Sequence, residues 1–213
     1  MQLYEKYRPK AWDEVVGQDK AVKSLIERRD TRGLGGKAYF ISGQSGTGKT
    51  TIARLIAKDV ASQICTIEVD ASDVDMAWTR QMERMSETYG FGGKSGRAFI
   101  INEAHGLSNA VTTRLLTALE RIRNHVVWVF TTTADGLELF EDKTDASPLL
   151  SRCVEIKLAR RDLAEPFARL LQSVGVKEGL NGRDLSEYIK VMRSCGNNLR
   201  RGFQKLENGE LRA

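Results

Sequence analysis

Short apolar runs alternate with longer stretches of helical periodicity through the first three quarters of the chain. The apolar runs lie at residues 38–41, 66–69, 98–101, 126–130 and 154–156. Apolar residues recur with helical spacing at residues 49–60, 74–89 and 109–123. Strands that are apolar almost throughout and alternate with helices predict an α/β fold, with a parallel sheet covered by helices on both faces.

The pattern changes after Leu158, where helical stretches follow one another with no strand between them. They lie at residues 162–171, 184–193 and 199–206. We therefore expect two domains, an α/β core over residues 1–159 and a small all-helical lid over residues 160–213.

Composition limits the class of protein. No apolar run approaches the ~20 residues that a membrane-spanning helix needs, and the N-terminus lacks the apolar segment of a secretory signal. We therefore expect a cytoplasmic protein without a membrane partner. Three scattered cysteines and two histidines form no metal-binding spacing, so we interpret them as packing residues. The net charge of +5 is compatible with a nucleic-acid partner, and equally with a solvated basic surface.

A glycine-rich phosphate-binding motif follows the first apolar run. The segment Gly43-Gln44-Ser45-Gly46-Thr47-Gly48-Lys49-Thr50 matches the pattern GxxxxGK[ST]. In such a loop, backbone N–H groups surround the phosphates, the lysine neutralises their charge and the hydroxyl reaches Mg²⁺. A strand before it and a helix after it are the context that the motif requires, so we expect residues 43–50, with Thr51 beside them, to bind ATP and Mg²⁺.

A second polar motif ends the run at residues 98–101. The usual pair at this place is Asp-Glu, but this chain has Asn102-Glu103. We expect Glu103 to be the catalytic base that polarises the attacking water. Asn102 can accept a hydrogen bond from metal-bound water but brings no charge, so with Thr50 it predicts a weakened Mg²⁺ site.

These motifs and several others resemble, in order, those of AAA+ clamp-loader small subunits (replication factor C small subunits and bacterial DNA polymerase III gamma/tau). The matching segments are Tyr4-Glu5-Lys6-Tyr7-Arg8-Pro9, Trp12-Asp13-Glu14-Val15-Val16-Gly17-Gln18, Asn102-Glu103-Ala104-His105-Gly106-Leu107-Ser108 and Leu115-Leu116-Thr117-Ala118-Leu119-Glu120. The resemblance covers essentially the whole chain. It implies an AAA+ P-loop core followed by the lid, without the collar domain that full members of the family carry after it.

The resemblance also implies roles for individual residues. The adenine would be framed by Tyr4, Tyr7, Arg8, Pro9, Val16, Gly17 and Gln18. A sensor of the γ-phosphate falls on Thr133, with Thr132 as the second choice, although threonines ending a strand also fit a plain β pattern.

Two arginines complete the implied catalytic set. Ser151-Arg152-Cys153 matches the family's arginine finger, which acts on the ATP of the neighbouring subunit. Arg200 matches the lid arginine that contacts phosphate, and Arg201 competes for this role. The predicted catalytic residues are thus Lys49, Glu103, Thr133, Arg152 and Arg200.

The function that follows is an ATPase subunit of a ring that loads a sliding clamp onto primer-template DNA, with ATP and Mg²⁺ as cofactors. The implied partners are other loader subunits, the clamp and the DNA. Two alternatives stay open: another replication or repair AAA+ ATPase, such as a Holliday-junction motor, or an ATP-binding structural subunit with little turnover because of Asn102. Basic pairs at Arg80/Arg84, and at Lys94/Arg97 on an expected loop, are candidate DNA contacts or merely solvated charges.

Overall fold

The computed structural model describes residues 1–141, 146–159 and 161–212. Contacts divide the chain into two compact units. The first, here the lid unit, comprises residues 1–22, 43–48 and 158–213, and the second, the sheet unit, comprises residues 23–42 and 49–157. The predicted domain boundary at residue 159 stays a prediction.

Five parallel strands form the sheet of the sheet unit, in the order β2-β3-β4-β1-β5. They are β1 (Lys37–Ser42), β2 (Ala61–Asp70), β3 (Gly96–Asn102), β4 (Val126–Thr132) and β5 (Cys153–Lys157). The predicted α/β class with a parallel sheet is confirmed. Since every strand runs in the same direction, Ser42, Asn102 and Thr132 all lie at the carboxyl edge.

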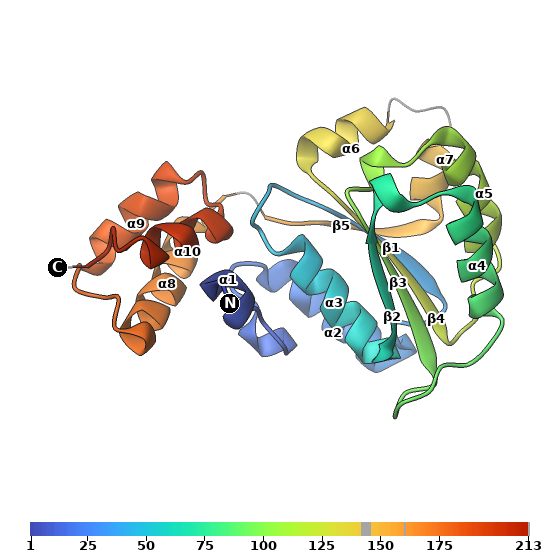
Figure 1. Cartoon of the computed structure of the whole chain (residues 1–213), viewed down its shortest axis with the longest axis horizontal. Helices are drawn as coiled ribbons and strands as arrows, with labels where there is room; N and C mark the ends of the chain where they lie inside the picture. The colour runs from blue at the N-terminus through green and yellow to red at the C-terminus, as the bar shows by residue number, and fades with distance from the viewer. Residues whose placement is uncertain (142–145, 160, 213) are drawn as a thin grey trace. The chain divides into compact units, whose positions relative to one another are not determined.

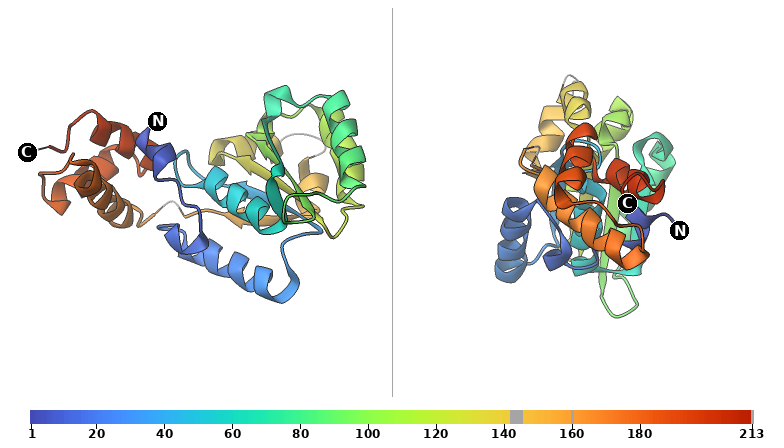
Figure 2. Two further views of the ribbon diagram at one scale, coloured as in Figure 1. Left: turned by 60° about the horizontal axis from the view of Figure 1, so that its bottom comes forward. Right: turned by 90° about the vertical axis from the view of Figure 1, so that its left-hand side faces the viewer.

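Helices cover both faces of the sheet (Figure 1). The longer ones are α2 (Asp19–Arg32), α3 (Lys49–Val60), α4 (Met76–Ser86) and α5 (Asn109–Leu119), and the shorter ones α6 (Ala134–Glu141) and α7 (Ala146–Ser151). Figure 2, in its left view, shows α2 and α4 on opposite sides of the sheet. Alternate side chains of each central strand therefore face opposite helical layers, which is why the middle of each of these strands is apolar.

One of the two layers can be followed residue by residue. Phe40, Phe99 and Trp128 share a cluster with residues of α4 and α5, among them Met82 and Leu115. All five side chains are at most 2% exposed. Single-turn 3-10 helices connect these elements at η2 (Ala71–Asp73) and η3 (Ala104–Gly106).

The lid unit has its own core. It contains α8 (Ala164–Glu178), α9 (Leu185–Ser194) and α10 (Leu199–Glu207), together with α1 (Leu3–Lys6) and η1 (Trp12–Glu14). The sequence predicted three helices here, but α8 continues beyond its expected end at residue 171. Leu3 of α1 is buried in one cluster with Phe167, Leu171 and Phe203. The N-terminal segment thus packs with the three lid helices. Among the described residues, no helix combines the length and apolar character needed to cross a membrane.

Polar contacts also attach the N-terminal segment to α8. The Nζ atom of Lys6 lies 2.6 Å from Oε1 of Glu178, and the hydroxyl of Tyr7 donates to the same carboxylate. The hydrogen bonds from Lys6 and then Tyr7 hold the pKa of Glu178 below its usual range. A carboxyl group whose pKa is lowered by folding stabilises the fold above its unfolded pKa and loses this contribution as the pH falls through its folded pKa.

We therefore predict that Glu178→Gln lowers the melting temperature at neutral pH, and that the gap to the parent protein closes below the ordinary glutamate range, about pH 4.3. Thermal unfolding followed by circular dichroism from pH 3 to 8 measures this gap. Glu165→Gln removes a carboxylate from an ion pair within α8 itself and serves as the control. A gap for Glu178→Gln that does not change with pH would contradict the prediction.

Candidate functional site

The glycine-rich loop between β1 and α3 has the backbone that its sequence predicts. Gly46 and Gly48 have φ of +77° and +103°, a region that favours glycine. A Cβ atom added at Gly48 would meet no atom within 4 Å, whereas one at Gly46 would come within 2.1 Å of Oδ1 of Asn198. Gly48 therefore leaves open space above the loop, and Gly46 allows the start of α10 to approach it closely.

The loop leads directly into α3, which begins with Lys49 and Thr50. Lys49 is 8% exposed, and the Thr50 hydroxyl lies 3.5 Å from Oδ1 of Asn102. The same amide oxygen accepts a bond of 3.0 Å from Thr131. Hydroxyl and amide oxygens are ligands suited to a hard divalent cation or its bound water, so this pair fits a Mg²⁺ ion without supplying charge.

Glu68 of β2 explains how the neutral side chain at position 102 is held. The Nδ2 atom of Asn102 donates to Oε1 of Glu68 at 2.9 Å, which turns the amide oxygen toward Thr50. Arg54 of α3 binds both oxygens of Glu68, at 2.7 and 3.1 Å. Sequence reasoning missed Glu68, because a polar residue inside a mostly apolar run gives no hint of its neighbour on the next strand.

Glu103 follows β3 in an uncommon backbone conformation. Its φ of 51° and ψ of 48° lie in the left-handed region, where a non-glycine residue is strained. Its carboxylate is 49% exposed and lies 3.5 Å from Nδ1 of His105. The same ring nitrogen is 3.1 Å from the hydroxyl of Thr132. The interpretation of His105 as a packing residue is therefore wrong, because it connects the ends of β3 and β4.

The three threonines at the end of β4 have different partners. The Thr131 hydroxyl donates to Asn102, that of Thr132 contacts His105, and that of Thr133 accepts from the backbone N–H of Gly136 at 3.0 Å. Thr133 thus caps the start of α6. The choice between Thr132 and Thr133 as a phosphate sensor stays a prediction.

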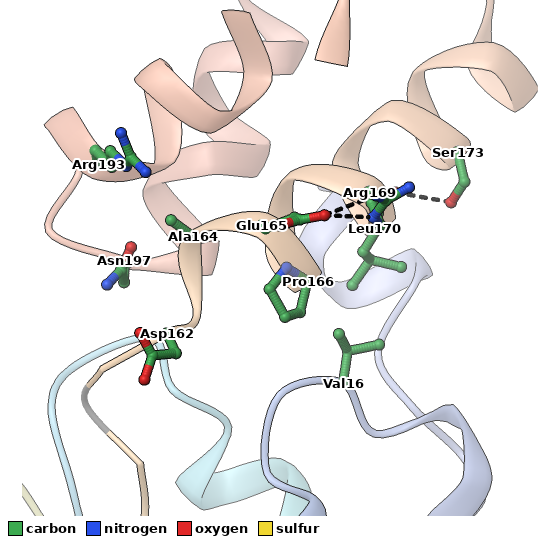
Figure 3. Close-up of a pocket in the computed structure, with 10 residues that line it drawn as sticks. All are labelled: Val16, Asp162, Ala164, Glu165, Pro166, Arg169, Leu170, Ser173, Arg193 and Asn197. Carbon is green, nitrogen blue, oxygen red and sulfur yellow. Dashed lines mark hydrogen bonds and ion pairs between the residues drawn. The ribbon is translucent and has the colours of Figure 1, made fainter. Parts of the chain in front are cut away.

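A pocket opens in the lid unit (Figure 3). It is lined by Val16, Asp162, Ala164, Glu165, Pro166, Arg169, Leu170, Ser173, Arg193 and Asn197. Its volume of ≈ 930 Å³ is in the range of small-molecule sites. Val16 and the first turns of α8 supply the apolar part. The buried Oδ1 of Asn197 has no hydrogen-bond partner among the residues that the structure describes. Val16 was predicted, whereas the α8 residues were missed because their spacing predicts only a helix.

The neighbouring residue, Asn198, connects this pocket to the glycine-rich loop. Its Oδ1 accepts from the backbone N–H of Arg201 at 3.2 Å and so caps α10. The backbone N–H of Leu199 donates to the carbonyl of Gly46 at 3.3 Å. Adjacent residues thus contact the two features: Asn197 lines the pocket, and Asn198 lies against Gly46 of the glycine-rich loop.

Gln18 ties together three segments of the lid unit. Its amide accepts from the backbone N–H of Ala159 at 2.7 Å and donates toward the carbonyls of Thr47 and Ala159 at 3.3 and 3.4 Å. It is 2% exposed. Gly17, with φ of +77°, lies against Leu163, where a Cβ would come within 2.8 Å. The structure thus gives Gln18 and Gly17 contacts within the protein.

The other predicted residues of the N-terminal segment also contact the protein. Tyr7 binds Glu178, and Arg8 pairs with Glu5. The guanidinium carbon of Arg200 lies over the ring of Tyr4, 5.1 Å from the ring centroid, which is a cation–π distance. Pro9 is half-buried in the segment between α1 and η1. Arg200 and Arg201 are both exposed at the start of α10, so the choice between them stays a prediction.

Arg152 lies in the sheet unit, directly before β5. Its guanidinium donates to the carbonyl of Pro148 at 2.8 Å and pairs with Glu120, which follows α5. The adjacent thiol of Cys153 is half-buried, and burial raises its pKa to about 12, so it stays protonated.

Two of the basic residues considered as DNA contacts have hydrogen-bond partners within the protein. Arg97 lies within β3 rather than on a loop and is 9% exposed, with bonds to the carbonyls of Thr88 and Tyr89. Lys94 donates to the carbonyls of Lys58 and Asp59 at the end of α3. Arg80 and Arg84 are exposed on α4.

A parallel sheet with a glycine-rich loop after its first strand and a polar cluster at its carboxyl edge defines a P-loop nucleotide-binding protein. The family model of the "ATPase family associated with various cellular activities (AAA)" matches residues 39–158. The chain therefore belongs to the AAA family of ATPases, as the resemblance implied.

Several curated relatives of the chain are named as subunits of DNA polymerase III. The DNA polymerase III subunit gamma/tau of Mycoplasma pneumoniae is 28% identical over 96% of this chain and 32% of that protein. The DNA polymerase III subunit gamma of Buchnera aphidicola subsp. Acyrthosiphon pisum is 30% identical over 87% of this chain and 54% of that protein. The chain thus spans about a third to about half of the relatives that it matches.

Solved structures support the fold. A variant of Thermotoga maritima RuvB superposes with a TM-score of 0.73 at 22% identity, over 94% of this chain and 64% of that one. At this identity the likeness concerns the fold alone.

Proposed function

We propose that this chain is an ATP-binding and ATP-hydrolysing subunit of a loader that places a sliding clamp onto primer-template DNA. The observation that carries the proposal is the cluster at the carboxyl edge of the sheet, where Thr50 and Asn102 share a hydrogen bond beside Glu103. Membership of the AAA family and the names of the relatives agree with it.

Each residue of this cluster has a role in the proposal. Lys49 would neutralise phosphate charge, and the oxygens of Thr50 and Asn102 would hold a hydrated Mg²⁺ ion, which would supply positive charge to the phosphates. Glu103 accepts a proton from the attacking water. Its left-handed backbone turns the carboxylate out of the strand, and His105 lies close enough to orient it.

The pocket of the lid unit is the proposed site of the adenine. Val16 supplies an apolar surface from one side, and Pro166 and Leu170 supply another from the first turns of α8 (Figure 3). Asn197, which also lines this pocket, would supply a polar side chain to the base. Since Asn198 adjoins Gly46, a nucleotide with its base in this pocket would direct its phosphates along the glycine-rich loop.

The remaining roles concern the ring. Arg152 would act on the ATP of a neighbouring subunit, while Arg200 and Thr133 would respond to phosphate in their own subunit. The partners are other loader subunits, the clamp and primer-template DNA, and the place of action is the cytoplasm.

Asn102 favours a second candidate, an ATP-binding subunit that contributes to the ring and turns over slowly. The amide is integrated by bonds to both Thr131 and Glu68, so it is a well-accommodated residue of the site. A subunit without the metal-binding charge would hydrolyse its nucleotide less often.

The first prediction concerns the adenine pocket. Leu170→Ala should weaken the affinity for an ATP analogue by about tenfold, since an apolar pocket loses part of one wall. Val176→Ala, on the exposed side of the same helix, is the matched control and should leave the affinity unchanged. Titration with a fluorescent ATP analogue measures both variants, and equal affinities would remove the base from this pocket.

The second prediction separates the two candidate functions. Asn102→Asp should lower the Mg²⁺ concentration needed for half-maximal analogue binding, because a carboxylate restores charge to the metal site and Arg54 already neutralises Glu68. If steady-state hydrolysis in assembled rings also rises, the missing charge limits turnover in the natural chain. Superimposable Mg²⁺ curves would mean that other ligands dominate.

The third prediction tests the assignment to a ring. Arg152→Ala and Glu103→Gln subunits should each hydrolyse ATP poorly in assembled rings, since a trans-acting arginine contributes ~10³–10⁵ in rate in GTPases. Mixed rings should recover part of the activity, because an Arg152→Ala subunit keeps its Glu103 and receives an intact finger from its neighbour. No recovery in rings shown to be mixed would place Arg152 outside the neighbour's site.

A further inference from the structure

The guanidinium of Arg152 is held in place by two groups of its own chain. Nη1 donates to the carbonyl of Pro148 at 2.8 Å, and Nη2 pairs with Oε1 of Glu120. The side chains of Arg152 and Glu120 are 32% and 52% exposed. An arginine that only projected toward a neighbouring subunit would not require contacts with its own chain. The contacts with Pro148 and Glu120 therefore require a different explanation.

Both contacts start from packed elements of the sheet unit. Glu120 directly follows α5, whose Leu115 and Leu119 belong to the main core, and Pro148 lies in α7, whose Leu149 and Leu150 belong to the same core. The backbone segments that carry the two acceptors therefore pack on one common core. A guanidinium held by both has its plane and direction defined before any partner arrives.

The exposure of this ion pair indicates whether the pair stabilises the fold or orders the arginine side chain. Pairs this exposed contribute little to the stability of a fold, because solvent screens them. They are also weaker than the bidentate contact that an arginine makes with phosphate where water is excluded. The contact can therefore order the long side chain without preventing its transfer to a stronger acceptor.

We propose that Glu120 is a positioning residue, which orders the guanidinium of Arg152 for the phosphate of a neighbouring subunit's ATP. The inference rests on the proposed function, since it requires that Arg152 acts in trans. Arg152 keeps its Nε and further N–H groups for the phosphate, because a guanidinium has five N–H donors. Ordering the side chain in advance removes part of the entropy cost of that contact.

The experiment measures only the contribution of Arg152 to hydrolysis in a neighbouring subunit. Donor subunits carry Glu103→Gln and so cannot hydrolyse their own ATP, while acceptor subunits carry Arg152→Ala and depend on the neighbour's arginine. The activity of such mixed rings reports on the donor's Arg152 alone. Substitutions at Glu120 are then added to the donor only, so that any effect on the acceptor's hydrolysis must cross the subunit interface.

We expect Glu120→Ala in the donor to lower the kcat of mixed rings by about three- to tenfold, the cost of ordering one long side chain. The KM for ATP should stay unchanged, because the acceptor's own pocket is untouched. Glu120→Gln keeps an oxygen acceptor and should restore most of the activity. Glu87→Ala removes the carboxylate of another exposed pair in the same unit, with Arg123, and should have no effect.

Three results would overturn the inference in different ways. Equal activities of the Glu120→Ala and Glu87→Ala donors would remove Glu120 from any role in positioning. A faster Glu120→Ala donor would make the ion pair a restraint on the finger instead. Mixed rings inactive even with the parent donor would refute the trans role of Arg152, and with it both this inference and that part of the proposed function. Melting temperatures of the Glu120 variants verify that the donors are folded.

Discussion

The parallel pairing of β1, β3 and β4 is the constraint on which the polar cluster of this protein depends. Because both faces of these strands are buried under helices, the side chains in the middle of each strand are apolar. The polar cluster therefore lies at the carboxyl edge, where Asn102 and Glu103 stand at the end of β3 and Thr131 to Thr133 at the end of β4. The register of the ladder, with Ile101 opposite Phe130, makes Asn102 and Thr131 hydrogen-bond partners.

In the lid unit, a single buried amide has a comparable role. Gln18 contacts the backbone of the glycine-rich loop at Thr47 and that of the segment leading to α8 at Ala159. Its burial makes every unmade hydrogen bond costly, so the three segments are held in one arrangement. The N-terminal segment is joined to the lid helices by this amide, by the buried Leu3 and by the cluster of Lys6, Tyr7 and Glu178.

The sequence predicted the elements that have strong periodicity and failed where periodicity is weak. Helix α3 begins at Lys49 and ends at Val60, as expected, because its apolar face is continuous. Helix α2 was not predicted, since only Val22 and Leu25 of its fourteen residues are buried apolar side chains. Motifs read along the chain located Thr50, Asn102 and Glu103. No motif contains Glu68 or Leu170, and the segments that contain His105 and Glu120 gave them no role. Only the packing of the chain shows the contacts of these four side chains.

The left-handed backbone of Glu103 sets stability and chemistry against each other at one position. Glycine would adopt a φ of 51° without strain, so a chain selected only for thermal resistance would lose the carboxylate there. The presence of glutamate at this strained position therefore indicates that the protein requires the carboxylate of Glu103. Stabilised versions of this chain should be designed around the residue, and consensus substitutions at the β3 edge should be screened for chemistry before they are screened for heat.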